Sequence, residues 1–442
     1  MVVGFTFADL FAGIGGFHAA LARHGGKSVF VSEIDESARN VYAQNWLDGN
    51  VGLISGDITE HTSGVVRVPK HNVLTGGFPC QPFSKSGNQL GVAEARGTLF
   101  HDIHRIIESK KPELILLENV RNLIGPKHID DYKIMIRLIR DLGYVVSDEP
   151  TILSPHEIPE YLGGTPQHRE RIFIGAVRVN STSAAKFRDI GPLLPRHPFV
   201  ELGPVEWDLA EFLEEHNSHE ASKQADLQIS MEQKRALKVW NDFVKKHLSE
   251  NGEQLPGLPL WTEYWKPRNE IRLPRSTPEW KRRFIERNSD FYMRNYTWID
   301  KWLSEAKLEE FIPSYRKFEW QAQGHRDISH CLVQFRPSGI RVKAPTYVPT
   351  FVAMAQTPVL GWEKRSLSVD EAKALQGFER NFDFGAQRDA LSFKQIGNAV
   401  HTGVASIVFQ ALVKRARQLE QPWANTVKIK NSQINMLPVQ DI

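Results

Sequence analysis

The sequence predicts an α/β protein built on a doubly wound, mostly parallel sheet, with a second, smaller domain attached. Three observations support this fold class. Apolar strands alternate with amphipathic helices over residues 5–178, which is the pattern of parallel βα units. Leu114–Leu117 is a continuous apolar run that follows Pro112, as expected for a strand buried on both faces. The composition then changes near residue 190.

The elements of the first domain follow one another closely. A strand is predicted at Phe5–Leu10, then a glycine turn over 12–16 and a helix that ends near Arg23. The next unit is a strand at Ser28–Ser32 and a helix at Glu36–Trp46. The later elements are a strand at Val73–Leu74 running into Gly76-Gly77, a helix over 98–109, the buried strand, a helix over Ile134–Leu142 and a strand over Arg171–Val177.

The region after residue 190 lacks this alternation. Eight of the 11 tryptophans lie between Trp207 and Trp320, and residues 261–346 hold 17 Lys/Arg against 11 Asp/Glu. Basic charge among aromatic residues suits a nucleic-acid surface, although a solvated, charged domain would give the same surplus. Helices are expected again over 368–377 and 392–412, before a polar tail. The expected division is 1–189, 190–365, a return segment 366–420 that completes the first domain, and a tail 421–442.

Composition excludes several classes of protein. Two cysteines exclude a disulfide framework and a four-cysteine zinc site, and they suit a reducing compartment. The sequence predicts neither a membrane span nor a signal peptide, so we expect a cytoplasmic location. His101 and His104 lack a third ligand nearby, so no metal is expected. Cys331 is expected to be a core residue. Trp298 and Trp302 are expected in the core of the second domain, with base stacking as the alternative.

The N-terminal glycine turn is typical of a nucleoside-cofactor site. Glycines between a strand and a helix let the backbone approach a ligand. Glu33 ends the next strand, 20 residues after Gly13, where a carboxylate can accept from ribose hydroxyls. His18 stands where a dinucleotide fingerprint has its third glycine, which disfavours a nicotinamide cofactor. Asp57, in Gly-Asp-Ile, offers a carboxylate to an adenine amine.

Three candidate catalytic features lie at the ends of the later strands. Cys80 stands between prolines after a glycine pair, an unusual setting for a core thiol and a suitable one for a nucleophile. Glu118 ends the buried strand and is either a capping or a proton-handling group. The charged cluster over 167–171 is either a solvated loop or a ligand-binding edge.

Eight sequence blocks, taken in order, resemble the DNA (cytosine-5)-methyltransferase family of the bacterial restriction–modification type. They are F-A-D-L-F-A-G-I-G-G, S-E-I-D, G-D-I, G-G-F-P-C-Q-P-F-S, L-E-N-V, T-P-Q-H-R-E-R, L-S-V-D-E-A-K-A-L-Q-G-F and Q-I-G-N-A-V. These blocks cover most of residues 5–178 and 366–405. The long gap between them is where the family carries its target-recognition domain. One departure is His168, where the family often has another basic residue.

The resemblance implies a catalytic fold and a set of roles. Cys80 would add to carbon 6 of a flipped-out cytosine. Glu118 would hydrogen-bond ring nitrogen 3 and the exocyclic amine. Arg171 would contact the base carbonyl, and Arg169 would lie near the thiolate and a phosphate. The Phe78 carbonyl would accept from the exocyclic amine.

The resemblance also implies S-adenosyl-L-methionine as cofactor, S-adenosyl-L-homocysteine as product and no metal. The expected cofactor-binding residues are Phe11, Gly13, Gly15, Glu33, Ile34, Asp57, Ile58, Asn398 and Val400.

The implied partner is double-stranded DNA, bound by a monomer, with a separate cognate restriction endonuclease as a further candidate partner. The polar loop over 84–97 would close over the DNA. DNA contacts are expected from Gln81, Ser84, Lys85 and Arg96, and from a basic reading loop with Arg336, Arg341 and Lys343. Two rivals stay open, an RNA cytosine methyltransferase of the same family and a catalytically inactive DNA-binding regulator.

Overall fold

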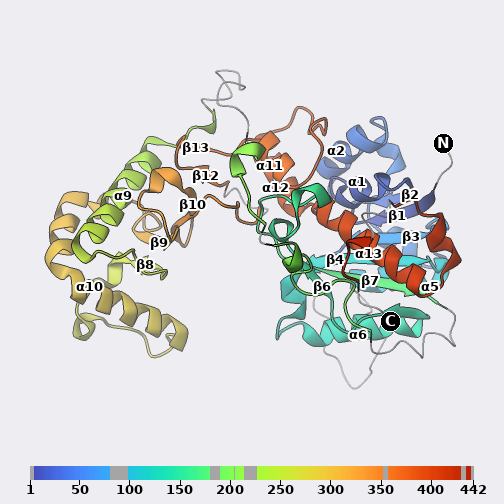
Figure 1. The fold of residues 1–442 in the computed structure, drawn as a ribbon, viewed down its shortest axis with the longest axis horizontal. Coiled ribbons are helices and arrows are strands. Elements are labelled where there is room, and N and C mark those ends of the chain that lie inside the picture. Colours follow the sequence, from blue (N-terminus) through green and yellow to red (C-terminus); the bar gives the residue numbers. More distant parts are fainter. Residues whose placement is uncertain are drawn as a thin grey trace. The chain divides into compact units, whose positions relative to one another are not determined.

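The computed structural model describes residues 4–79, 98–179, 190–203, 205–213, 226–351, 357–429 and 435–439. The chain divides into two compact units (Figure 1). The first comprises Met1–Trp207, Thr350–Ala353 and Ala372–Ile442, and the second Asp208–Pro349 and Met354–Glu371. The change of composition near residue 190 therefore precedes the boundary between the units, which follows Trp207.

The first unit is built on a seven-stranded sheet in the order β2-β1-β3-β4-β7-β5, with β6 paired to β7. β1 to β4 run parallel, whereas β7 runs antiparallel to β4, β5 and β6. The strands are β1 Phe5–Leu10, β2 Gly26–Ser32, β3 Val73–Gly77, β4 Leu114–Val120, β5 Tyr144–Val146, β6 Thr151–Leu153 and β7 Arg171–Arg178. The sheet confirms the predicted fold class. The short strands β5 and β6 were not predicted, because three residues carry too little periodicity.

Helices cover both faces of this sheet (Figure 1). Phe5 and Phe7 of β1 pack in one core with residues of α1 and α13, whereas Ala8 and Leu10 pack in another with residues of α5 and α6. The alternation follows from the two-residue period of a strand. The helices of this unit are α1 Gly16–Ala22, α2 Glu36–Trp46, α3 Thr59–Thr62, α5 Leu99–Lys110, α6 Ile129–Asp141, α12 Asp389–Asn398 and α13 Thr402–Gln418, and α11 Val369–Leu375 spans the boundary between the units.

The predicted single helix over 392–412 is wrong. The chain leaves α12 at Ala399 and re-enters α13 after His401, whose backbone dihedrals are extended. His401 caps the second helix, because its Nδ1 accepts from the Val404 amide at 3.2 Å. The segment Asp389–Gln418 also passes as a membrane span by length and composition, contrary to expectation, but 89% of its apolar window is buried inside the structure. A buried core segment accounts for that composition.

The described part of the C-terminal tail is not merely polar. Ala424, Val427, Leu437 and Val439 are buried in the same core as α13. This part of the tail therefore belongs to the first unit.

The second unit combines two long helices, α9 Met231–Asn251 and α10 Glu279–Ala306, with a six-stranded sheet that the sequence did not reveal. The order is β13-β12-β10-β11-β9-β8. The strands are β8 Leu260–Trp261, β9 Lys317–Gln321, β10 Leu332–Arg336, β11 Gly339–Lys343, β12 Val359–Leu360 and β13 Arg365–Ser366. Trp298, Trp302 and Cys331 are buried in its core, which confirms the expectation for all three.

Candidate active site

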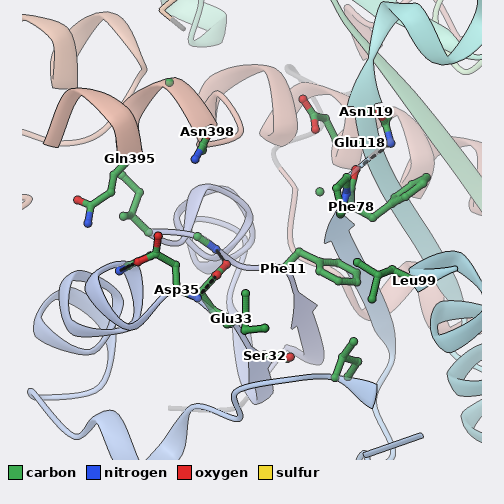
Figure 2. A pocket seen from close by; sticks show the side chains of 18 of the residues that line it. Phe11, Ser32, Glu33, Asp35, Phe78, Leu99, Glu118, Asn119, Gln395 and Asn398 are labelled. Atoms are coloured by element: carbon green, nitrogen blue, oxygen red, sulfur yellow. Dashed lines mark hydrogen bonds between the residues drawn. The ribbon is translucent and has the colours of Figure 1, made fainter. Parts of the chain in front are cut away.

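A cavity of about 470 Å³ lies in the first unit at the carboxyl ends of the parallel strands (Figure 2). This edge is where open α/β sheets bind ligands, because the strand-to-helix loops gather there. Its lining comes from segments far apart in the sequence. Among the sequence-predicted residues, the cavity brings together Phe11, Gly13, Glu33, Ile34, Asp57, Ile58, Phe78, Glu118, Arg169, Arg171 and Asn398.

The Glu33 side chain is held by the main chain at one side of this cavity. One carboxylate oxygen accepts from the Gly13 amide at 2.7 Å and the other from the Asp35 amide at 2.8 Å (Figure 2). Each oxygen keeps a second lone pair for a ligand hydroxyl. The Gly13 backbone has a φ of 55°, and Phe11 adopts a similar φ of 53°. A left-handed conformation at a phenylalanine is strained, and such strain clusters at binding sites.

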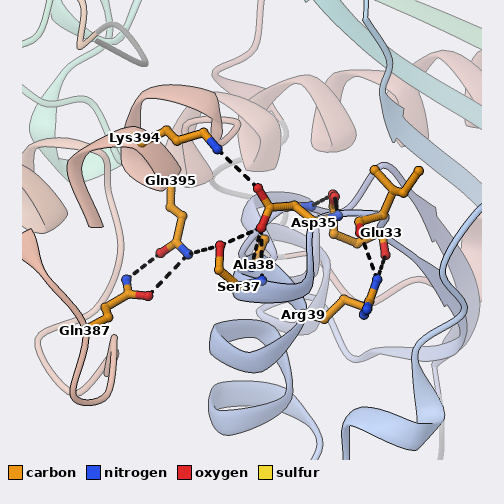
Figure 3. Close-up of polar contacts among 10 residues, drawn as sticks. Glu33, Asp35, Ser37, Ala38, Arg39, Gln387, Lys394 and Gln395 are labelled. Atoms are coloured by element: carbon orange, nitrogen blue, oxygen red, sulfur yellow. Dashed lines mark hydrogen bonds and ion pairs between the residues drawn. The ribbon is translucent and has the colours of Figure 1, made fainter. Parts of the chain in front are cut away.

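Ile34 and Asp57 both line the cavity. Ile34 is 70% exposed, although it is a large apolar residue. One oxygen of the Asp57 carboxylate accepts from the Thr59 amide at 2.9 Å. Arg39 donates to the carbonyls of Glu33 and Ile34 at 3.0 and 2.9 Å (Figure 3). The lining therefore offers an apolar side chain and a carboxylate, and Arg39 fixes the backbone at Glu33 and Ile34.

Gly15 and Val400 do not line the cavity. A Cβ on Gly15 would stand 2.2 Å from the Trp46 indole nitrogen, and the φ of Gly15 is 92°. A Cβ on Gly16 would stand 2.3 Å from the Val400 carbonyl oxygen. Gly15 and Gly16 thus let the start of α1 pack closely against Trp46 and the α12–α13 junction.

Sequence reasoning missed a set of polar contacts between α12 and the start of α2 (Figure 3). Lys394 Nζ lies 3.3 Å from Asp35 Oδ2, and Gln395 Nε2 donates to Ser37 Oγ at 3.2 Å. Asp35 also caps α2, and its hydrogen bond from Ser37 is the largest cause that lowers its pKa. Lys394, Gln395 and Asp35 all line the cavity. Asp35, followed two residues later by Ser37, is a sequence pattern typical of a helix N-cap, and it was the available signal for this site.

At the opposite side of the cavity, Glu118 and Arg171 form an ion pair. Glu118 Oε1 lies 3.0 Å from Arg171 Nε, between neighbouring antiparallel strands. Burial raises the pKa of Glu118, and this effect exceeds the opposing influence of Arg171 and Arg169. The carboxyl is therefore closer to its protonated, hydrogen-donating form than a solvated glutamate is.

Arg169 is only 2% exposed and is held mainly by backbone carbonyls. Its guanidinium donates to Gly397 O at 3.0 Å, Ala399 O at 2.9 Å and Phe351 O at 3.3 Å. Burial, and then the neighbouring Arg171, lowers the pKa of Arg169 to about 9. The Arg169 side chain ties the end of α12 to the cavity wall by donating to the Gly397 and Ala399 carbonyls where the helix breaks.

Asn119 is a second residue that sequence reasoning missed. Its Nδ2 donates to the Phe78 carbonyl at 2.8 Å (Figure 2). This contact fixes the last described turn before Cys80 and leaves the carbonyl one further lone pair. Cys80, Gln81, Ser84, Lys85 and Arg96 lie outside the described residues. The Leu-Glu-Asn-Val block held the signal, because its asparagine follows the expected catalytic glutamate.

Other candidate positions are placed as follows. His104 is buried in α5, and within the described ranges no group of three His, Cys, Asp or Glu is arranged to hold a metal ion. In the second unit, Arg336, Arg341 and Lys343 do not form a loop. Arg336 ends β10, and the other two lie on β11. Ile340 and Val342 alternate with Arg341 and Lys343 and pack into the core. Residues 332–343 therefore form an antiparallel hairpin of β10 and β11 instead of a loop.

Comparisons with known proteins show the family to which this chain is similar. A family model described as C-5 cytosine-specific DNA methylase matches residues 5–414. The Type II methyltransferase M.AluI of Cellulosimicrobium cellulans is 36% identical over 489 aligned positions, covering 94% of this chain and 93% of that protein. M.HpaII of Haemophilus parainfluenzae is 43% identical over 171 positions, covering 38% of this chain and 45% of that protein. A solved structure of a Spodoptera frugiperda DNMT2 mutant covers 92% of this chain and 99% of its own, with a TM-score of 0.50 at 16% identity, and so has a similar fold.

Proposed function

The chain belongs to the C-5 cytosine-specific DNA methylase family and is a DNA (cytosine-5)-methyltransferase, and from that premise we propose that it modifies one cytosine within a short duplex sequence. The family implies methylation that depends on S-adenosylmethionine, with DNA as substrate. The proposal assigns roles in cofactor binding, cytosine activation and base recognition to individual residues of this chain. The observation that carries it is the cavity in which Glu33 and Glu118 face one ligand space from two sides.

Glu33, Ile34 and Asp57 are proposed to hold the nucleoside part of S-adenosylmethionine. The free lone pairs of Glu33 suit the two ribose hydroxyls, and the exposed Ile34 side chain suits the adenine face. Asp57 keeps a carboxylate oxygen for the adenine amine. The cofactor supplies an electrophilic methyl group on a sulfonium. Asn398 lines the cavity on the α12 side.

Glu118, Arg171 and Cys80 are proposed to activate the cytosine. The target base must leave the stack, because carbon 5 is buried in duplex DNA. A Cys80 thiolate would form a bond to carbon 6 while Glu118 donates to nitrogen 3 and the ring electrons shift to carbon 5. The raised pKa of Glu118 supports that donor role. After carbon 5 takes the methyl group, its proton leaves to a base and the sulfur–carbon bond breaks.

Arg171 is proposed to contact the carbonyl of the same base. Glu118 holds its Nε at 3.0 Å and its Nη1 donates to the Glu170 carbonyl at 2.9 Å, so Nη2 is the guanidinium nitrogen left for a ligand in the cavity that Arg171 lines. Arg169 is proposed to act at the same site by holding the end of α12, through its contacts with Gly397 and Ala399.

The second unit is proposed to read the bases that flank the target. A cavity sized for one nucleoside cofactor and one base cannot also contact neighbouring pairs, whereas the second unit adds basic strands and two long helices. Similarity to M.AluI along nearly the full length of both chains supports a role in restriction–modification. In that role the methyl group would protect DNA from a separate endonuclease.

Bisulfite sequencing of DNA from cells that express the chain tests this proposal. Protected cytosines are expected within one short recurring sequence, and a Cys80→Ser variant is expected to protect none. Duplexes that carry 5-fluorocytosine at that position should trap the wild-type chain covalently. Protection without a recurring sequence would contradict site-specific reading, and methylation of RNA in preference to DNA would contradict the substrate.

A further inference from the structure

Three strands of the second unit present polar side chains on one face. Phe318, Ile340 and Val333 turn to the core, so their neighbours along each strand lie on the opposite face. We call this opposite face the basic strand face. It includes Glu319 and Gln321 on β9, Gln334 and Arg336 on β10, and Arg341 and Lys343 on β11.

One carboxylate holds two arginines there. Glu319 Oε2 accepts from Arg336 Nη2 at 2.6 Å and from Arg341 Nε at 3.0 Å, and Gln321 Nε2 donates to its other oxygen. Strand register places Arg341 directly beside Glu319. The carboxylate is well buried, with only 10% of its side chain exposed, whereas Arg341 keeps 30% exposed. The exposed end of Arg341 is therefore the part available to a ligand.

The charges on this face do not balance. Two guanidinium groups and Lys343 surround a single carboxylate, and burial followed by Arg341 lowers the pKa of Lys343. A pair formed only for stability needs one arginine, and the second adds like-charge repulsion in a half-buried place. Gln334 Oε1 and Arg336 Nε are also buried and have no hydrogen-bond partner among the described residues. The face therefore has surplus positive charge, which suits a polyanion.

The contact made by Glu319 leaves a specific part of Arg341 free. It uses the Nε side of the guanidinium, and no further hydrogen bond from this guanidinium is made to the described residues. The two terminal nitrogens remain as a planar pair of donors. Two parallel donors of this kind match O6 and N7 of guanine in the major groove. Fixing the plane beforehand removes the cost of ordering a long side chain on binding.

We propose that Glu319 is a positioning residue that orients Arg341 for bidentate recognition of a guanine in the target sequence. The proposal rests on the proposed role of the second unit in reading bases. It assigns Glu319 no contact with the transferred methyl group or the target cytosine. Its loss should therefore change which sequences are methylated rather than the chemistry.

The test uses the full-length chain and a plasmid library with randomised duplex sequence, read by bisulfite sequencing. Arg341→Ala and Glu319→Gln are each expected to relax one and the same base position, with selectivity for guanine falling about 5- to 100-fold. Their double variant should be no worse than Arg341→Ala alone, because both remove one contact. Glu319→Gln should also bind non-cognate duplex more tightly at low salt, since a negative charge is lost. Glu310→Gln is the matched control, because Glu310 forms an exposed pair with Arg235 in the same unit, and its selectivity should stay unchanged.

Arg341→Lys keeps the charge and removes the planar donor pair, so it tests the inference even if Glu319→Gln unfolds, and it should relax the same position. If Glu319→Gln lost methylation equally at all sequences, the inference would be overturned. It would also be overturned if Arg341→Ala relaxed one base position while Glu319→Gln and Arg341→Lys kept their selectivity there. The second result would leave base reading by the second unit intact. Unchanged selectivity in Arg341→Ala would instead contradict base reading by this arginine, and the positioning role with it.

Discussion

Around the cavity of the first unit, Glu33, Arg169 and Asn119 are fixed by contacts with the main chain, whereas on the basic strand face of the second unit the polar side chains are fixed by one another. Glu33 is held by two backbone amides, and Arg169 by three backbone carbonyls. Glu319 is held by two arginines and a glutamine. Backbone contacts place a group wherever the fold places the strand, while side-chain contacts depend on neighbours that can change together. The first arrangement suits fixed chemistry, and the second suits recognition that can vary.

The comparison predicts that the largest effects come from the first unit. Cys80→Ser is expected to abolish turnover and covalent trapping, because a hydroxyl gives almost no anion at neutral pH. Cys331→Ser should leave activity within a few-fold, since Cys331 is buried in the core of the second unit. Methyl incorporation into DNA and trapping on 5-fluorocytosine duplexes measure both variants. Activity lost only in the Cys331 variant would reverse the assignment.

A smaller loss is expected when the proton donor is replaced. Glu118→Gln should lower kcat roughly 10²- to 10³-fold, within the usual range for acid–base groups, and leave DNA binding intact. Because burial raises the pKa of Glu118, its protonated form is lost as the pH rises through that pKa. The alkaline limb of the kcat profile should therefore flatten in this variant. Glu113→Gln, one residue before β4 and paired with Arg178, is the control, and an unchanged alkaline limb in Glu118→Gln would contradict the donor role.

The two regions also differ in how far the sequence could predict them. Gly13, Glu33 and Glu118 lie in short blocks at strand ends and turns, so these cavity residues were expected from the sequence, whereas Asp35, Lys394 and Gln395 were not. Glu319 lies in an ordinary alternating strand, 17 residues before Arg336. Its role depends on the pairing of β9 with β11 across an intervening stretch of chain. The alternation within one strand does not reveal which distant strand it pairs with, so this pairing was not predicted.

The break between α12 and α13 was missed for a related reason. The segment is apolar enough to continue as one helix, and His401, the buried Arg169 and Gln376 bind the groups freed at the junction. Arg169 lies more than 200 residues earlier in the sequence. A tertiary contact therefore decides a local boundary.

Removing one of the backbone-held groups should weaken a single ligand selectively. Glu33→Ala is expected to weaken binding of S-adenosylmethionine by about 1.5–3 kcal/mol, the usual loss for hydrogen bonds to a charged group. Binding to DNA without cofactor should hardly change. Calorimetry on the free protein measures the first quantity, with the exposed Glu36→Ala in α2 as control. Equal cofactor affinity in both variants would remove Glu33 from the site.

The smallest effect is expected from the most weakly held charge of the basic strand face. Lys343 Nζ lies 4.9 Å from the centre of the Tyr347 ring, and its charge has no carboxylate partner among the described residues. A single ammonium group can neutralise one phosphate but cannot read a base edge in two places. Lys343→Ala should therefore weaken binding to cognate and single-mismatch duplexes alike, and reduce the slope of log affinity against log salt by about 1. Lys246→Ala, on α9 and paired with Glu250, is the control and should leave the slope unchanged. If Lys343→Ala changed selectivity at one base position, Lys343 would contact a base as well as Arg341. The assignment of Arg341 to base recognition and of Lys343 to a phosphate contact would then be wrong.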